Sequence, residues 1–379
     1  MNSDRYRPSL LLLVLAILAF VATGCARDSA PELLSIDESS RRALPAGDVV
    51  GAASGTSAHV WRGIPYAKPP VGALRWRAPE PTAPSQDELA ALESGSACSQ
   101  YPMPLADGRD PDVPIGSEDC LFLNVHAPRH DPETVPTGDA RHPVMVWIHG
   151  GANLTGETAT YDWSRFAAKH GVVVVGMNYR LGPFGWFRFD ALHGEGDDAL
   201  DRSGNYGTLD LVRALEWVQE NVGAFGGDPS NVTIFGESAG GNNVITLLLS
   251  EPARGLFHRA ISQSGGTWSA SLAESENWTD DETPGRPFSS REFLAALLIA
   301  DGTVDSREAA KRFVETATPS ELETYLRSQP AEAIMRVVAD AFTLSTTKRK
   351  LPILPLIADS CDLVGQLGMR VCAIWVSTI

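Results

Sequence analysis

The chain has 379 residues, of which 43% are hydrophobic and 21% are charged, values that are ordinary for a globular protein. This length is sufficient for one large α/β domain with a well-buried core. With 31 basic and 47 acidic residues the net charge is −16. Such a charge argues against nucleic acid or an anionic membrane surface as a binding partner.

The N-terminal residues have the order of a bacterial lipoprotein signal. Arg5 and Arg7 precede the apolar run Leu10–Val21, which is too short to cross a bilayer as a helix. The next four residues, Ala22-Thr23-Gly24-Cys25, resemble a lipobox, in which small residues lead to a cysteine that becomes acylated. The alternatives are an ordinary secretory signal with an incidental cysteine, and an uncleaved anchor.

The lipobox interpretation divides the chain into three parts. We expect a signal peptide over residues 1–25, a polar tether over 26–42 and a folded domain over 43–379. The protein would be exported to the periplasmic side of a membrane or to the cell surface. Its only membrane contact would be the lipid on Cys25, which holds the domain in water beside the bilayer.

Apolar strand patterns alternate with helical ones through the middle of the chain. Runs typical of buried strands occur at Val144–Ile148, Val172–Met177, Val232–Phe235 and Ala260–Gln263. The clearest helix is Leu209–Val222, in which Trp217 is a core residue rather than a ligand contact. This alternation predicts an α/β fold whose mostly parallel sheet carries helices on both faces.

A loop of small residues follows the first of these strands. The strand His142–Ile148 leads into His149-Gly150-Gly151-Ala152, where backbone N–H groups can approach a substrate closely. Acyl transfer needs such donors for the oxyanion of its tetrahedral intermediate, although the same sequence alone would also suit a tight turn.

The most informative motif is Gly236-Glu237-Ser238-Ala239-Gly240. It lies between the strand Asn231–Phe235 and a helical pattern over Ala239–Leu249. A serine on a sharp turn from strand to helix has its hydroxyl raised above the sheet, and the helix N-terminus directs free N–H groups at the developing oxyanion. The context favours Ser238 as a nucleophile over an ordinary glycine-rich turn. The expected oxyanion donors are the backbone N–H groups of Gly151, Ala152 and Ala239.

Beyond this motif the pattern becomes mainly helical. Helices are expected over Phe293–Ile299, Arg307–Thr316, Glu321–Arg327 and Ala333–Phe342, whereas the polar segment Gly182–Asn205 suggests a surface excursion. Trp268 suits either a wall of an acyl-binding pocket or ordinary packing.

Together these motifs resemble the type-B carboxylesterase and cholinesterase family of α/β-hydrolases. The matching segments occur in the family's order, at Gly63–Ala67, Leu74–Trp76, Glu118–Val125, Trp147–Gly151, Asn178–Gly182, Gly204–Gly207, Phe225–Pro229, the turn at Ser238 and Ala260–Gly265. The resemblance implies hydrolysis of small-molecule carboxylic esters through a covalent acyl-serine at Ser238. It also implies that the C-terminal helices cover the mouth of the catalytic gorge. Ala152 departs from the family, where many members have a third glycine, but its N–H stays available.

The resemblance further implies a disulfide between Cys98 and Cys120, whose positions are 22 apart. An exported protein can form such a bond, whereas two buried free thiols are the alternative. Cys361 and Cys372 are not expected to pair. No cofactor or metal is expected, because Pro128 separates His126 from His130 and prevents a helix from presenting both.

The remaining catalytic groups are harder to find. In α/β-hydrolases the acid and then the histidine follow the serine in sequence, and only His258 of the eight histidines follows Ser238. Neither His258 nor His149 is expected to be the base. Residues Arg370–Thr378 resemble the strand that precedes the acid in the family. The chain would then either stop before the acid or lose its reading frame near Asp359-Ser360.

Under either interpretation the acid and histidine are absent and the last strands of the sheet are missing. We therefore expect an exported serine esterase that is inactive or impaired as this chain. The alternatives are a non-catalytic cholinesterase-like binding or adhesion protein, and the product of a decayed gene.

Overall fold

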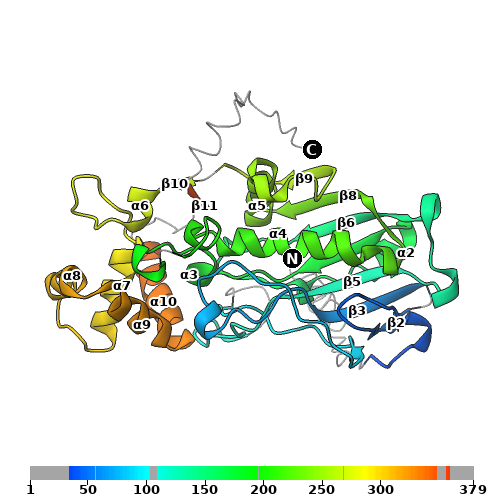
Figure 1. Cartoon of the computed structure of the whole chain (residues 1–379), viewed down its shortest axis with the longest axis horizontal. Coiled ribbons are helices and arrows are strands. Elements are labelled where there is room, and N and C mark those ends of the chain that lie inside the picture. The colour runs from blue at the N-terminus through cyan, green and yellow to red at the C-terminus, as the bar shows by residue number, and fades with distance from the viewer. Residues whose placement is uncertain are drawn as a thin grey trace, which may run out of the picture. The chain divides into compact units, whose positions relative to one another are not determined.

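The computed structural model describes residues 34–55, 57–102, 109–194, 196–267, 269–347 and 356–358. Its centre is a seven-stranded sheet with the order β2-β3-β5-β7-β6-β8-β9 (Figure 1). The strands are β2 (Ala52–Ser54), β3 (Ala58–Pro65), β5 (Phe122–Pro128), β6 (His142–Ile148), β7 (Val173–Met177), β8 (Gly227–Glu237) and β9 (Arg259–Gln263). Two short parallel pairs lie outside it, β1 (Val49–Val50) with β4 (Leu89–Ala90) and β10 (Ser269–Ser271) with β11 (Leu356–Ala358).

Strands β7, β6, β8 and β9 are parallel to one another, as the sequence predicts. The other half of the sheet is antiparallel, because β5 pairs with β7, β3 with β5 and β2 with β3 in that sense. The sequence patterns had not identified β2, β3 or β5 as strands. The sheet is therefore mixed, and its parallel half carries the strand ends at which α/β sheets bind ligands.

The helices are α2 (Ser164–His170), α3 (Gly182–Gly185), α4 (Tyr206–Asn221), α5 (Ala239–Leu249), α6 (Leu272–Glu276), α7 (Ser290–Ala300), α8 (Arg307–Thr316), α9 (Pro319–Ser328) and α10 (Ala331–Thr347). Single-turn 3-10 helices lie at Glu38–Ser40, Gly72–Leu74, Pro132–Thr134, Gly138–Ala140, Thr158–Thr160, Asp190–Leu192, Asp201–Ser203, Val222–Phe225 and Glu251–Ala253. Helices α5 and α8 have the predicted bounds, and α7, α9 and α10 contain the segments predicted for them. Helix α4 begins three residues before the predicted Leu209 and ends at Asn221, so Val222 already belongs to the 3-10 helix that follows.

Alternation along the strands explains why helices lie on both faces of the sheet. In β6, Val144, Val146 and Ile148 join the large core cluster to which α4 contributes Leu211 and Leu215. Trp147 points to the other face, where it packs with Ala167 of α2. Successive side chains of a strand point to opposite faces, so a continuous apolar run needs cover on both.

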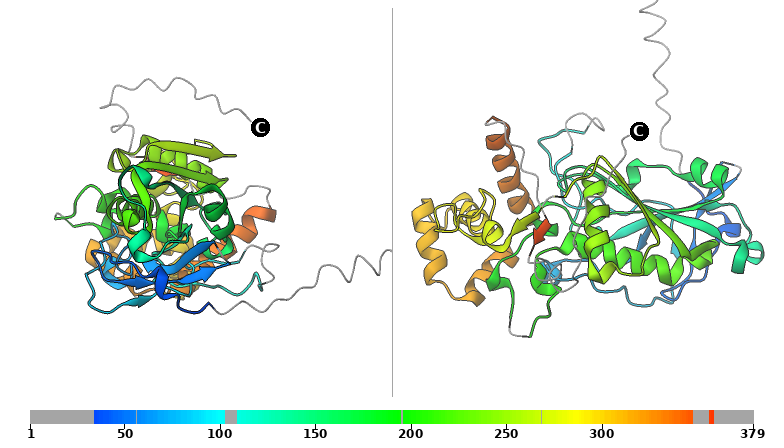
Figure 2. Two further views of the ribbon diagram at one scale, coloured as in Figure 1. Left: turned by 90° about the vertical axis from the view of Figure 1, so that its right-hand side faces the viewer. Right: turned by 90° about the horizontal axis from the view of Figure 1, so that it is seen from above.

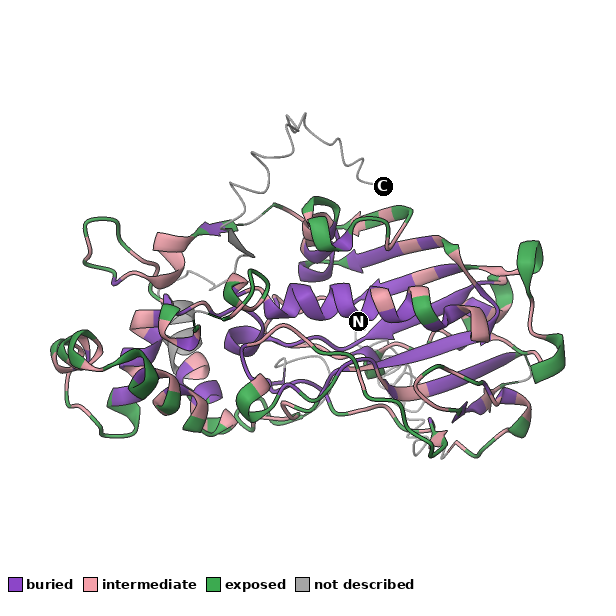
Figure 3. Cartoon of the chain, in the orientation of Figure 1, coloured by how far each residue is buried: buried purple, intermediate pink, exposed green. Residues whose placement is uncertain are grey.

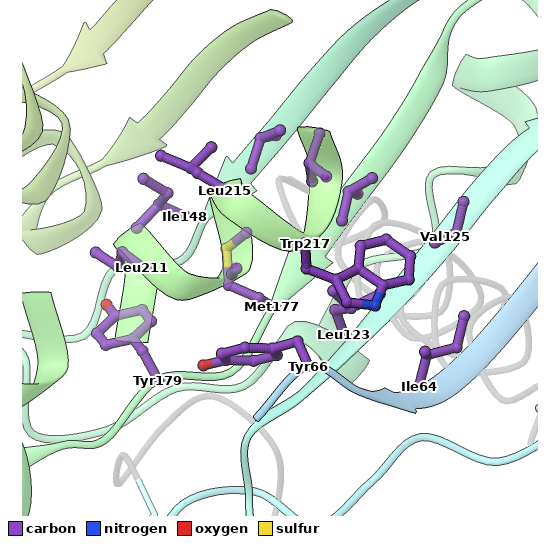
Figure 4. Packing of buried hydrophobic residues seen from close by; sticks show 14 of the residues in the cluster. Ile64, Tyr66, Leu123, Val125, Ile148, Met177, Tyr179, Leu211, Leu215 and Trp217 are labelled. Carbon is purple, nitrogen blue, oxygen red and sulfur yellow. The ribbon is translucent and has the colours of Figure 1, made fainter. Parts of the chain in front are cut away.

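Most residues of α4 are buried against the sheet. Figure 3 shows this helix and the central strands as almost continuously buried. In Figure 4, Leu211, Leu215 and Trp217 of α4 lie close to Ile148 of β6 and Met177 of β7. Trp217 is therefore a core residue, as predicted.

Helices α6–α10 gather at one end of the sheet (Figures 1 and 2), and α7–α10 contribute side chains to a second apolar cluster there. Arg75 connects these helices to the segment that precedes β5. Its guanidinium pairs with both carboxylate oxygens of Glu118, and its Nη1 donates to the carbonyl of Gln329 (2.8 Å) just after α9. This arginine thus satisfies acceptors at a helix C-terminus that would otherwise lack donors.

The segment Gly182–Asn205 differs in part from its predicted surface position. Phe184, Phe187, Phe189 and Leu192 are buried in the cluster to which α7–α10 contribute. Only the part after Leu192 is mostly polar and partly exposed. The aromatic residues were overlooked because acidic residues and glycines dominate the local composition, while their apolar cover comes from helices about a hundred residues later.

Several sequence predictions lie outside the described residues. They concern Cys25 and its lipobox, Trp268, Cys361, Cys372 and the strand-like segment Arg370–Thr378. In the portion of the chain that the structure does describe, no helix combines the length and the apolar character that a membrane span requires.

The predicted disulfide between Cys98 and Cys120 is present, with the two Cα atoms 4.9 Å apart. Both cysteines are buried beside the start of β5. The bond closes a loop of 22 positions, which restricts the unfolded chain much more than the folded one.

The double variant Cys98→Ala/Cys120→Ala should lower the free energy of unfolding by about 3 kcal/mol, because it removes this restriction on the unfolded chain. Urea denaturation measures the change. Dithiothreitol should destabilise the unsubstituted protein by a similar amount and leave the variant unaffected. Equal stability of the two proteins under oxidising conditions would contradict the prediction.

Candidate active site

Ser238 lies on the turn between β8, which ends at Glu237, and α5, which begins at Ala239. Its backbone has φ 55° and ψ −119°, a conformation that residues other than glycine rarely adopt. The Ser238 N–H donates to the carbonyl of Gln263 in β9 (2.9 Å), and the residue is exposed. The chain thus makes the sharp strand-to-helix turn that the sequence predicts.

Glycines on both sides of Ser238 allow this turn. A Cβ atom on Gly236 would lie 2.5 Å from the carbonyl oxygen of Gly240. A Cβ atom on Gly240 would lie 2.1 Å from the carbonyl oxygen of Ile148, at the end of β6. Any side chain at these two positions would push α5 away from the sheet, so their glycines are required by close backbone contact.

The loop after β6 lies directly beside this turn, because β6 and β8 are neighbours with Ile148 opposite Gly236. A Cβ atom on Gly150 would be 3.3 Å from the Cβ of Ser238. The two motifs, far apart in the sequence, therefore meet at the carboxyl ends of adjacent parallel strands. Such strand ends are where open α/β sheets place their ligands.

The predicted oxyanion donors are available for a ligand. Gly151 has φ 104° and Ala152 has φ 57°, so the loop runs through left-handed backbone conformations. Within the described residues, no hydrogen bond is donated by the N–H of Gly151 or of Ala152. Ala239 is the first residue of α5, so its N–H has no acceptor within the helix. The nucleophile and donor assignments remain predictions, and this geometry is compatible with them.

Two buried asparagines hold the loop and were not identified from the sequence. Asn153 follows Ala152, and Asn243 lies on α5. The Asn243 Nδ2 donates to Asn153 Oδ1 (3.0 Å), and the Asn153 Nδ2 donates to Asn243 Oδ1 (3.4 Å). Nothing in the sequence marks these residues, because an isolated asparagine is typical of any turn or polar helix face.

Gln100 holds the far end of the same loop. Its Oε1 accepts from the Gly156 N–H (2.7 Å) and the Thr155 hydroxyl (2.7 Å), and its Nε2 donates to the Gly156 carbonyl (2.9 Å). Gln100 lies two residues after Cys98, so the disulfide anchors the residue that fixes this loop. The sequence placed the disulfide but gave no sign of the contact between Gln100 and the loop.

His149 has a structural role in this loop. Its ring stacks on Tyr179 with centroids 4.4 Å apart, and its Nδ1 donates to the Gly150 carbonyl (2.9 Å). Burial lowers the pKa of His149 to about 4, despite the opposing hydrogen bond to Gly150. The ring is therefore neutral at pH 7 and held by its own loop. That His149 is not the base stays a prediction.

His258 is too far from Ser238 to accept its proton. The His258 Nδ1 accepts a hydrogen bond from the Val232 N–H (3.2 Å), six positions before Ser238 along β8. Strand residues rise by about 3.3 Å each, so the two side chains are roughly 20 Å apart. All eight histidines lie in described residues, and none has a hydrogen bond to Ser238 among those described.

No group of three histidine, cysteine, aspartate or glutamate side chains that could hold a metal occurs among the residues with described positions. Three histidines face aspartates at distances between 3.3 and 3.8 Å, namely His59 with Asp37, His126 with Asp162 and His193 with Asp197. Among the described residues, none of these three pairs has a hydrogen bond to Ser238.

The burial of three histidines lets us predict how the free energy of unfolding depends on pH. Burial lowers the pKa values of His59, His126 and His149 from 6.5 to about 4. Between these two values the unfolded chain binds protons that the folded protein does not. Stability should therefore fall as the pH decreases from 6.5 to 4, by up to about 1.4 kcal/mol per pH unit for each histidine.

Urea denaturation at several pH values between 7.5 and 4 measures this dependence. The variant His149→Gln should show a shallower slope, because one of the three titrating groups is gone. A free energy of unfolding that stays constant or rises on acidification through this window would show that the histidines are not buried in neutral form.

Comparisons with known proteins agree with the arrangement of these elements. Residues 39–363 match the model of the carboxylesterase family. The para-nitrobenzyl esterase of Bacillus subtilis is 44% identical over 249 residues, which are 65% of this chain and 46% of that protein. The liver carboxylesterase of Sus scrofa is 40% identical over 277 residues, which are 70% of this chain and 46% of that protein.

Comparison with solved structures identifies proteins of the same kind. A thermophilic para-nitrobenzyl esterase is 36% identical with a TM-score of 0.64, over 85% of this chain and 58% of that one. A carboxylesterase of Geobacillus stearothermophilus is 33% identical with a TM-score of 0.62, over 85% of this chain and 56% of that one. The chain spans about half the length of these relatives. By family match, sequence identity and fold, it belongs to the carboxylesterase family of α/β-hydrolases.

Proposed function

We propose that this chain carries the nucleophile and oxyanion hole of a serine carboxylesterase that acts on small-molecule carboxylic esters. The observation that carries the proposal is the position of Ser238, raised on a turn of positive φ beside the backbone N–H groups of the loop after β6. The family membership and the names of the relatives support an ester as the substrate.

In the proposed reaction the Ser238 Oγ attacks the ester carbonyl carbon, and its proton passes to a base. The carbonyl oxygen becomes an oxyanion that accepts hydrogen bonds from the N–H groups of Gly151, Ala152 and Ala239. The C–O bond to the alcohol then breaks, and the alcohol leaves with the proton. Water attacks the acyl-serine by the same route and releases the carboxylic acid. Each missing oxyanion donor would slow acylation by about 10²–10³.

Turnover also requires a base beside Ser238, and no hydrogen bond between Ser238 and any of the eight histidines occurs among the described residues. We therefore propose that the 379-residue chain by itself is impaired in ester hydrolysis. The same observation favours a second candidate, a non-catalytic binding protein of the cholinesterase-like type. The retained serine and free loop N–H groups favour the esterase.

Repair of the chain distinguishes these candidates. A chimera would join this chain, up to the end of its match with the Bacillus subtilis para-nitrobenzyl esterase, to the residues of that esterase that follow the match. We expect the chimera to hydrolyse 4-nitrophenyl butyrate and the chain alone to show no measurable hydrolysis. A well-folded chimera without activity would favour the binding protein.

We also propose that the protein is exported and acylated at Cys25. The order of basic residues, short apolar run and cysteine in the first 25 residues supports this proposal. Radiolabelled palmitate should enter the protein in a bacterial host, and Cys25→Ser should abolish labelling. Release of an unlabelled soluble form by the unsubstituted chain would show that Cys25 is not a lipidation site.

A further inference from the structure

The proposed oxyanion hole is assembled from two separate elements. Gly151 and Ala152 belong to the loop after β6, whereas Ala239 begins α5. Donors stabilise a transition state only if they converge on one oxygen with hydrogen-bond geometry. Some contact must therefore set the position of the loop relative to α5.

The asparagine pair described above joins these two elements next to the donors. Asn153 is the residue after Ala152, and Asn243 lies one helical turn after Ala239. Both side chains are buried, with 6% and 4% of their surface exposed. Their amides bond reciprocally, so each satisfies a donor and an acceptor of the other in a place that excludes water.

The loop backbone needs such support. Ala152 and Asn153 both have φ 57°, and a left-handed conformation costs about 1–2 kcal/mol for most residues, though less for asparagine. Two such residues in succession persist only where neighbouring contacts hold them. Rotation of the backbone at either residue would turn the adjacent N–H groups away from the oxygen at Ser238.

Other contacts fix the loop to different parts of the protein. The Tyr179 hydroxyl donates to the His149 carbonyl (2.6 Å), and the Gly182 N–H donates to the Asn153 carbonyl (2.7 Å). Both come from the chain that follows β7, and Gln100 comes from the disulfide loop. Among the described residues, only the Asn153–Asn243 pair connects the loop to α5 by hydrogen bonds.

We propose that the Asn153–Asn243 pair is a positioning device that aligns the loop half of the oxyanion hole with the half on α5. The proposal rests on the assignment of these N–H groups as oxyanion donors. Neither asparagine touches the substrate in this arrangement. They act through the backbone of Ala152 and the first turn of α5.

Hydrogen exchange of the 379-residue chain tests the pair without requiring activity. The N–H groups of Leu154 and Thr155 donate to the Gly151 carbonyl and report on the loop conformation. Asn243→Ala should increase their exchange rates about tenfold or more, because it removes the buried bonds between the two amides and leaves the Asn153 Nδ2 without its acceptor, while the Tyr179 hydroxyl still donates to Asn153 Oδ1 (3.5 Å). Asn153→Gly removes the same pair of hydrogen bonds, and glycine tolerates the positive φ at this position. If Asn243→Ala does not fold, the exchange measurement uses Asn153→Gly instead.

The neighbouring residue on the same helix provides a matched control. Asn242 Oδ1 accepts from the Gly266 N–H (2.5 Å) and makes no bond to the loop among the described residues. Asn242→Ala should leave exchange at Leu154 and Thr155 unchanged. In the double variant Asn153→Gly/Asn243→Ala, the exchange rates at Leu154 and Thr155 should equal those of either single variant, and the two increases should not multiply. Unchanged exchange in folded Asn243→Ala, or multiplicative effects, would overturn the proposal.

A second measurement separates positioning from general destabilisation. With imidazole added as an external base, a fluorophosphonate should label Ser238, and mass spectrometry gives the rate. In Asn243→Ala the saturating rate should fall about 10- to 100-fold with an unchanged half-saturating concentration, since an oxyanion hole acts on the transition state. Simple unfolding would reduce the number of labelled sites but not their rate. If the unsubstituted chain is never labelled, the proposed function fails, and exchange alone decides the inference.

Discussion

Replacement of Ser238 by alanine in the active chimera is expected to lower kcat for 4-nitrophenyl butyrate by about 10⁵–10⁶. In the proposed mechanism the change removes the atom that forms the acyl bond. Binding should survive, because the oxyanion donors are backbone groups that the substitution leaves in place. Stopped-flow and steady-state assays of nitrophenolate release measure the loss.

The turn itself supplies a control for this experiment. Ser238 is exposed and has little packing to lose, so Ser238→Ala should unfold at nearly the same urea concentration as the parent chimera. Activity within tenfold of the parent would show that Ser238 is not the nucleophile. Robust Ser238-dependent turnover by the 379-residue chain alone would instead reveal a base that the structure does not place at Ser238.

Asp210→Ala should lower the free energy of unfolding by about 3–5 kcal/mol, the largest stability effect expected from a single substitution here. Asp210 on α4 is fully buried, and its carboxylate accepts from the Arg180 side chain at 2.7 and 2.9 Å and from the Arg180 N–H at 2.9 Å. Removing it leaves the arginine charge buried without its partner. Urea denaturation measures the change.

A second acidic residue on the same helix provides the comparison. Glu216 also pairs with an arginine, Arg213, at 2.7 Å, but 43% of the Glu216 side chain is exposed. Water screens an exposed pair, so Glu216→Ala should cost no more than about 1 kcal/mol. Similar losses for the two variants would contradict the argument that burial, and not the ion pair as such, makes Asp210 important.

The sequence by itself determined the local parts of the candidate site. The apolar run of β8, the glycines around Ser238 and the helical spacing of α5 are short-range features, and each limits the backbone within a few residues. The parallel strands and the C-terminal helices were predictable for the same reason. The cysteine pair was predictable only through the family resemblance.

The tertiary structure alone decided how these parts are held together. Asn153 meets Asn243, and Gln100 meets Thr155 and Gly156, across long separations in sequence that carry no periodic signal. The pairing of β3 with β5 and of β5 with β7, and the burial of the aromatics near Phe187, were likewise hidden, because the partners come from distant segments. Burial of a polar or irregular segment depends on what covers it. That cover is a property of the fold and not of the local sequence.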